Sequence, residues 1–170
     1  QPWKNPSPSI TDMNSVIGYH IAGSLESLNI SVGRGTRRPF QLYGAPFFDA
    51  KRLAAALNAA KLPGVKFLPV VFRPSRSAYR SKLCRGIRLV ITNRRKVDAM
   101  RTFITMAREV HKHLPEKGRE KNWQRIAHAV GDSNFIDSLA KGEAMNVLLT
   151  RIAADVKAFQ DVRQKYLLYP

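Results

Sequence analysis

Apolar residues recur at two spacings along the chain, and the change of spacing separates a mixed first half from a helical second half. Nearly continuous apolar runs over 65–72 and 86–92 predict two strands, because short apolar runs between Pro and Gly are typical of covered strands. Pro69 lies inside the first run and favours an edge strand or a bulge. Asp49, a good helix cap, precedes a run of strong helix formers and predicts a helix over 51–60.

Beyond residue 96 the apolar positions recur every three or four residues, which is the period of an amphipathic helix. The pattern predicts a long helix over 97–114, a shorter helix over 122–130, a turn of helix around 135–139 and a last helix from about 143 to 166. Proline or glycine residues separate these segments. The apolar tail 166–170 is expected to dock back on the core.

The first 32 residues are less regular. Residues 1–15 are rich in Pro and Ser and are interpreted as a lead-in or linker. Residues 16–32 alternate loosely and predict a short element with a turn at Gly23-Ser24. Strands early and helices late indicate an α+β fold. We therefore expect one domain over 16–170, with a small mixed β-sheet packed against several helices and a helical C-terminal half.

Composition limits the possible classes of protein. With 170 residues, 44% of them hydrophobic, the chain is long enough for one domain with a core. No apolar run approaches the roughly 18 residues that a transmembrane helix needs, and no signal-peptide pattern is present. The single cysteine, Cys84, is expected to be a half-buried small hydrophobic side chain and not a nucleophile. His111 and His113 point to different faces of the predicted helix, so we assign no metal and no cofactor.

The charge is the most unusual bulk property. The formal net charge is +17, and the segment from Lys51 to Val97 carries thirteen Lys or Arg and no Asp or Glu. Such a field attracts polyanions, among them nucleic acid, acidic glycans and anionic wall polymers. The basic loop 73–85 surrounds Tyr79, which could stack on a base. No RRM, KH or zinc-finger pattern accompanies it.

Residues 29–49 hold the densest group of special backbone residues. Gly33, Gly35 and Gly44 permit backbone angles that side chains forbid, and two prolines stiffen the segment. Between them stand four polar residues, Arg34, Thr36, Arg37 and Arg38. Such a loop can present N–H groups and a guanidinium to an oxygen-rich ligand. It can equally be a structural turn.

Glu26 is the only acidic residue between Asp12 and Asp49. It is interpreted first as an ion-pair partner of Arg34 and second as a site residue. Glycoside hydrolysis generally needs two carboxyl groups. Before the long helix the candidates are Asp12, Glu26 and Asp49, and the sequence does not show that two of them converge. There is no G-x-S-x-G, P-loop or dinucleotide motif.

Three strings in this loop carry a family resemblance: Ser31-Val32-Gly33-Arg34-Gly35-Thr36, then Pro39-Phe40, then Gly44-Ala45-Pro46. They resemble the signature of the C-terminal domain of the exo-β-N-acetylmuramidase (NamZ) family. Further agreement extends from about Pro6 to Tyr169, including Leu62-Pro63-Gly64-Val65 and Tyr166-Leu167-Leu168-Tyr169. The sequence departs from the family pattern at His20, Ile21, Ser27 and Phe47.

The resemblance implies a bacterial protein that is secreted or periplasmic at full length and removes N-acetylmuramic acid from the non-reducing ends of peptidoglycan fragments. It implies a second, Rossmann-like N-terminal domain, with the active site between the two domains. This chain resembles only the C-terminal domain, so we expect it to form one wall of the cleft and to lack the full site. Glu26 is the candidate catalytic residue, and the candidate substrate-binding residues are Asn29, Ser31, Gly33, Arg34, Gly35, Thr36, Phe40 and Tyr79. The alternative function is a non-catalytic basic module that binds an anionic polymer such as nucleic acid.

Overall fold

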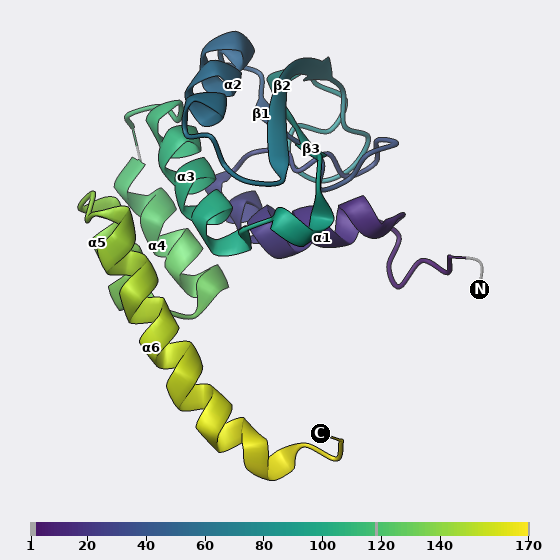
Figure 1. Ribbon diagram of the computed structural model, residues 1–170. Coiled ribbons are helices and arrows are strands. Elements are labelled where there is room, and N and C mark those ends of the chain that lie inside the picture. The colour runs from purple at the N-terminus through teal and green to yellow at the C-terminus, as the bar shows by residue number, and fades with distance from the viewer. Residues whose placement is uncertain (1–2, 118, 170) are drawn as a thin grey trace.

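The computed structural model describes residues 3–117 and 119–169 (Figure 1). Its first half contains α1 (Met13–Ala22), β1 (Leu42–Ala45), α2 (Ala50–Ala59), β2 (Val65–Phe72) and β3 (Cys84–Ile91). Its second half contains α3 (Ala99–Lys112), α4 (Arg119–Val130), α5 (Ser133–Ala140) and α6 (Met145–Arg163). Short 3-10 turns lie at Gly23–Leu28 (η1), Arg94–Lys96 (η2) and Gln164–Tyr166 (η3). The expected α+β class with a helical C-terminal half is confirmed.

The three strands form one sheet in the order β1-β3-β2. Both pairings are antiparallel, so the sheet is antiparallel where a mixed one was expected. β2 lies at an edge, as Pro69 indicated, since an edge strand tolerates a residue without an N–H. The short strand β1 was not predicted, because it lies inside the glycine- and proline-rich loop. Gly44 allows its close approach to β3: a Cβ there would lie 2.3 Å from the carbonyl oxygen of Arg85.

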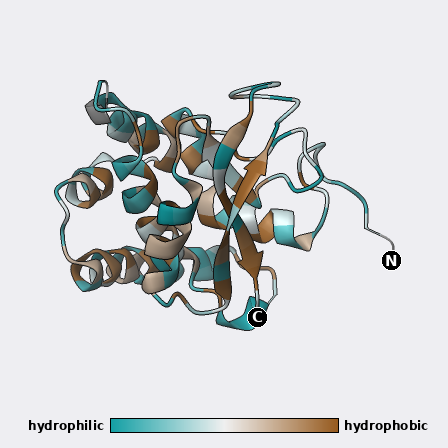
Figure 2. Cartoon of the chain, turned by 90° about the horizontal axis from the view of Figure 1, so that it is seen from above, coloured by the Kyte–Doolittle hydropathy of each residue, from teal (hydrophilic) through white to brown (hydrophobic). Residues whose placement is uncertain are grey.

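Helices surround this sheet in a way that makes one continuous core. α2 packs on β2 and β3, α3 contacts both α1 and α2, and α4 packs on η1 and α5. Figure 2 shows hydrophobic residues along the strands and on inward-facing parts of the helices. Tyr43 of β1 is fully buried at the centre, and its hydroxyl lies 2.9 Å from the carbonyl oxygen of Gly18 and 2.8 Å from that of Phe40. This phenol therefore ties α1 to the 29–49 loop.

The N-terminal region differs from the expectation. α1 begins at Met13, inside the segment 1–15 that was interpreted as a lead-in, and Asp12 caps it by accepting from the Ser15 N–H at 2.6 Å. The loose alternation over 16–32 is a helix followed by the η1 turn, which starts at Gly23 near the predicted break. Gly18 in mid-helix obscured the pattern. It is needed because the Phe40 carbonyl oxygen would lie 1.9 Å from any Cβ there.

The four helices of the second half and α2 lie close to their predicted positions. Asp49 and Asp98 cap α2 and α3 by accepting from backbone N–H groups. Cys84 is fully buried on β3, where a half-buried side chain was expected. The expected docking of the C-terminal tail is wrong: α6 leaves the body (Figure 1), and Tyr166, Leu168 and Tyr169 are 77%, 89% and 81% exposed. In the described part of the chain no helix has the length and apolarity to cross a bilayer.

Candidate functional site

The 29–41 loop is held by its own backbone. Asn29, Gly33 and Gly35 adopt positive φ values of 57°, 77° and 75°, which reverse the chain direction. Ser31 pairs with Gly44 through two backbone hydrogen bonds of 2.8 and 3.0 Å, and its hydroxyl accepts from the Gly33 N–H. Thr36 donates to the Gly33 carbonyl from its hydroxyl at 2.7 Å and from its N–H at 3.1 Å. The loop is therefore a built structure that fixes the position of Arg34.

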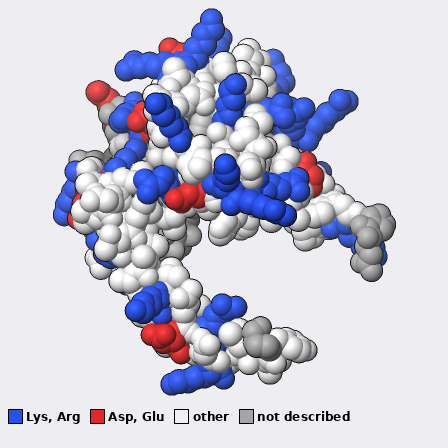
Figure 3. Space-filling model, viewed as in Figure 1, with Lys and Arg blue, Asp and Glu red and all other residues white. Residues whose placement is uncertain are grey.

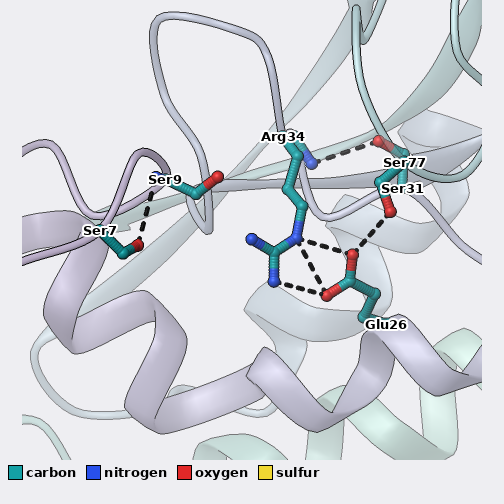
Figure 4. A network of polar contacts seen from close by, with 7 residues as sticks. Ser7, Ser9, Glu26, Ser31, Arg34 and Ser77 are labelled. Atoms are coloured by element: carbon teal, nitrogen blue, oxygen red, sulfur yellow. Dashed lines mark hydrogen bonds and ion pairs between the residues drawn. The ribbon is translucent and has the colours of Figure 1, made fainter.

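Arg34 and Glu26 form a two-pronged ion pair (Figure 4). Nε of Arg34 lies 2.8 Å from Oε1 of Glu26, and Nη2 lies 2.9 Å from Oε2. The guanidinium carbon is 4.8 Å from the centre of the buried Phe40 ring, which adds a cation–π contact. The preferred interpretation of Glu26 as the ion-pair partner of Arg34 is confirmed. Parallel N–H···O bonds of this kind fix both groups in orientation as well as in distance.

The β2–β3 loop closes over this pair. The Ser77 hydroxyl donates to Oε1 of Glu26 at 2.8 Å, and the Ser75 hydroxyl donates to the carbonyl of Gly35 at 2.8 Å (Figure 4 shows Ser77 beside Glu26). Tyr79 lies on the same loop, where its hydroxyl accepts from Asn29 at 3.4 Å. The two loops singled out in the sequence are thus one assembly built around a single carboxylate.

The electrostatics of the site keep Glu26 ionised. Burial alone would raise the pKa of Glu26, but hydrogen bonds from Arg34 and Ser77 and the charge of Arg34 together lower it. The hydrogen bond to Glu26 raises the pKa of Arg34 against the opposing effect of burial. A general acid needs a raised pKa. The ion pair therefore favours a role for Glu26 as a fixed negative charge that can stabilise positive charge, over a role as a proton donor.

Two grooves meet at this ion pair. The larger, of about 1050 Å³, is bounded on one side by Glu26 and Arg34 and on the other by residues from α3, α4, α5 and α6. The second, of about 660 Å³, is lined by Glu26, Asn29 and part of α4. A smaller pocket of about 220 Å³ contains Asn29, Phe47 and Tyr79. A ligand in the largest of these three would meet both Glu26 and Arg34, and a ligand in the second would meet Glu26 alone of the pair.

The predicted site residues fall into two groups. Glu26, Asn29, Arg34 and Tyr79 line these grooves. The others support the loop: Ser31 and Phe40 are buried, Thr36 bonds to the loop backbone, and Gly33 and Gly35 supply its turns. Asp12 and Asp49 cap helices, and the hydrogen bonds found for them do not include Glu26.

Residues on the far wall of the large groove were missed by sequence reasoning. Phe103, Asp132, Phe135 and Asp155 line it, and His20 of α1 lines the groove on the Glu26 side. Phe103 and Phe135 each belong to the apolar pattern of their own helix. That pattern indicates a core position and gives no sign of a groove. Asp132 caps α5 by accepting from the Phe135 N–H at 2.8 Å. Only the packing of α4 and α5 beside η1 brings these residues opposite Glu26. Among the described residues no group of three or more His, Cys, Asp or Glu is placed to hold a metal.

An α+β domain of this shape occurs in solved proteins. Two crystal structures of DUF1343 family proteins from Bacteroides fragilis match it, one with a TM-score of 0.79 at 25% identity over 99% of this chain, the other with 0.74 at 22% over 97%. The chain belongs to the family described as "Exo-beta-N-acetylmuramidase NamZ, C-terminal", which matches residues 17–169. This confirms the resemblance found in the sequence.

A curated relative supports the same assignment. The chain is 32% identical over 168 residues to "Peptidoglycan beta-N-acetylmuramidase NamZ" of Bacillus subtilis, a match that covers 99% of this chain and 41% of that protein. The matched fractions of the two Bacteroides chains are 45% and 43%. The chain therefore spans less than half the length of the relatives that it matches.

Proposed function

We propose that this domain forms one wall of the sugar-binding cleft of a peptidoglycan-directed exo-β-N-acetylmuramidase. The observation that carries the proposal is the Glu26–Arg34 pair, which is fixed by two loops and lines the large groove, with Glu26 also lining the second groove. The name of the Bacillus relative supplies the substrate class. The remaining wall and the remaining catalytic groups belong to an N-terminal part, carried on the same chain or on a partner, in a bacterial protein that acts outside the cytoplasm.

Each member of the pair has a chemical role in this proposal. The hydrogen bonds of the described residues occupy Nε and Nη2 of Arg34 and leave Nη1 without one. N-acetylmuramic acid carries a lactyl carboxylate, a good partner for that remaining edge of the guanidinium. The ionised Glu26 would stabilise the positive charge that develops at the anomeric carbon during glycosidic cleavage. In this proposal the general acid comes from the N-terminal part, in line with the lowered pKa of Glu26.

Ligand titration of matched variants tests the role of Arg34. Calorimetry of N-acetylmuramic acid binding is compared for the unmodified chain, Arg34→Lys and Arg37→Lys, an exposed arginine of the same loop. We expect Arg34→Lys to weaken binding at least tenfold, since a lysine cannot serve the carboxylate and Glu26 together. Arg37→Lys should leave affinity within twofold. N-acetylglucosamine, which lacks the lactyl group, should bind more weakly and respond less to Arg34→Lys. Equal effects of the two substitutions, or equal binding of the two sugars, would contradict the proposal.

Catalysis is tested with a chromogenic muramyl glycoside. Release of N-acetylmuramic acid is followed with the chain alone and with the chain fused behind the preceding part of the Bacillus relative. The proposal predicts turnover only in the fusion, with a large loss in Glu26→Gln. Turnover by the chain alone would mean that these residues hold a whole site.

The second candidate function is binding of an anionic polymer. Figure 3 shows Lys and Arg side chains projecting over much of one face of the molecule. Burial and then the charge of Arg38 lower the pKa of Arg88, so these two arginines repel each other. Affinity for a poly(dT) oligonucleotide should then fall steeply with salt. Binding of a muramyl sugar should change little over the same range, and this difference separates the two functions.

A further inference from the structure

The apolar face of α6 is buried in the core along the first half of the helix and exposed to solvent along the second half. In its first half Leu148 is fully buried, and Met145, Leu149 and Ile152 pack against the core. The same face continues at the same spacing through Val156 and Phe159 and reaches Tyr166 in η3. These three side chains are 49%, 63% and 77% exposed. One apolar stripe therefore begins in the core and continues outside it.

The other side of this helix has a different composition. Ala154, Lys157, Ala158 and Asp161 lie there, which are small or charged residues typical of a solvated face. Most of the large apolar residues therefore lie on one side. Val147 and Val162 lie outside this stripe and are 46% and 54% exposed, and Arg163 interrupts the stripe between Phe159 and Tyr166. We call the segment 153–169 the arm. It continues from α6 into Leu167, Leu168 and Tyr169, all of them exposed. An apolar stripe of this length on a solvent-exposed helix is typical of an interaction surface.

The arm is continuous with the candidate site. Ile152 and Val156 line the same large groove as Glu26 and Arg34. In Figures 1 and 3 the arm extends from the body below α3–α5, and an open hollow separates it from the rest of the molecule. A partner seated on the apolar face of the arm would therefore also cover the mouth of the groove.

The lengths of the relatives identify the occupant. This chain matches 41% of the Bacillus protein and 45% of one Bacteroides chain, and the matching family is described as C-terminal. The structural match covers 99% of this chain and so includes the arm. We propose that the apolar face of the arm is the docking surface for the N-terminal part of a NamZ-type protein, which it holds over the Glu26–Arg34 groove. This rests on the proposed function only in taking that part as the other wall of the cleft.

Trypsin digestion tests the docking directly, because the arm carries cleavage sites at Lys157 and Arg163. The rate of cleavage at these sites is measured by mass spectrometry in the isolated chain and in the fusion with the preceding part of the Bacillus relative. We expect cleavage to slow at least tenfold in the fusion. The double variant Val156→Asp/Phe159→Asp should restore the fast rate, because two carboxylates cannot be buried against an apolar partner without a large loss.

The matched control is Ala154→Asp/Ala158→Asp, which puts the same charges on the solvated side and should keep the protection. Both pairs are exposed in this chain, so neither double variant removes a core contact, and any small shift in its midpoint of thermal unfolding follows helix propensity. Equal cleavage of the arm in isolated and fused chains would overturn the proposal. Protection that survives Val156→Asp/Phe159→Asp would also overturn it. So would a dimer of the isolated chain that this variant dissociates, because the apolar face would then bind a second copy of the chain.

The outcome is separable from that of the proposed function. If the fusion does not protect the arm but sugar binding still depends on Arg34, only the proposed docking surface is contradicted. If the fusion protects the arm but no sugar binds, the proposed sugar-binding cleft is contradicted and the proposed interface stands.

Discussion

The loop assembly around Glu26 and the arm of α6 use apolar residues in opposite ways. Phe40, which contacts Arg34, and Tyr43, whose hydroxyl bonds to the Phe40 carbonyl, are 1% and 0% exposed. Phe159 and Tyr166 on the arm are 63% and 77% exposed. The first region has its backbone reversals and loop contacts satisfied within the domain. The second has an apolar face without a cover. The loop assembly thus satisfies its own contacts within the domain, whereas the arm leaves its apolar residues exposed.

The largest expected contrast between the two regions is in the cost of losing a leucine. Leu25→Ala, at a fully buried position in η1, should lower the free energy of unfolding by about 2–5 kcal/mol, since it leaves a cavity in the core. Leu168→Ala, at 89% exposure, should change it by less than about 0.5 kcal/mol. Urea denaturation of both variants checks this. Similar losses would mean that the tail packs on the body after all.

Exchanging glycine and alanine should affect stability in opposite directions in the two regions: glycine is the more stable choice at position 18, and alanine is the more stable choice on the arm. Gly18→Ala should destabilise the chain by about 1–3 kcal/mol, because the new Cβ overlaps the Phe40 carbonyl and outweighs the better helix propensity. On the exposed arm, Ala153→Gly should cost about 1 kcal/mol, following propensity alone. Thermal unfolding of the pair measures both. A stabilising Gly18→Ala would contradict the close approach of α1 and the loop.

Removing one hydroxyl should matter only where it is buried. Tyr43→Phe leaves the carbonyl oxygens of Gly18 and Phe40 without that donor and should cost about 1–2 kcal/mol. Tyr169→Phe, at 81% exposure, is the control and should have no measurable effect. Chemical denaturation distinguishes the two. An equal response would indicate that water reaches the Tyr43 hydroxyl.

The smallest expected effect is on the ion pair itself. Glu26→Gln should lower stability at pH 7 by up to about 1 kcal/mol, because the pair is partly exposed and screened. The pKa of Glu26 is lowered on folding. The stabilising contribution of its carboxylate is therefore present above the ordinary glutamate pKa of about 4.3, and it is lost as the pH falls through the lower pKa of the folded state. Stability curves of the two proteins should therefore converge in acid. A gap that widens in acid would reverse the direction of the shift.

Regular elements with local signals could be predicted from the sequence. Asp49 and Asp98 mark the starts of α2 and α3, and the apolar runs mark β2 and β3. β1 could not be predicted, because Leu42–Ala45 has no strand pattern of its own and is defined by pairing with β3. α1 was obscured for a similar reason, since Gly18 serves a contact with Phe40 and not the helix.

The candidate site was predictable to the same extent. Glu26 is an isolated acidic residue, and it lies eight residues before Arg34 in the sequence. Their pairing could therefore be predicted from the sequence. Ser77 is 51 residues from Glu26 and reaches it only because the sheet order places the β2–β3 loop beside β1. The far wall of the groove depends on helix packing. The exposed arm was misjudged because an apolar residue gives the same signal whether its partner lies within the chain or outside it.

Cys84 gives the molecule a practical property for studying the arm. It is the only cysteine, its side chain is fully buried in β3, and burial raises the pKa of its thiol against the opposing charge of Arg73. Alkylating reagents attack the thiolate, so this sulfur should be nearly inert in the folded protein. A second cysteine introduced on the arm would then take a fluorophore or spin label by itself. The position of α6 relative to any partner could be followed in solution without first removing a native residue.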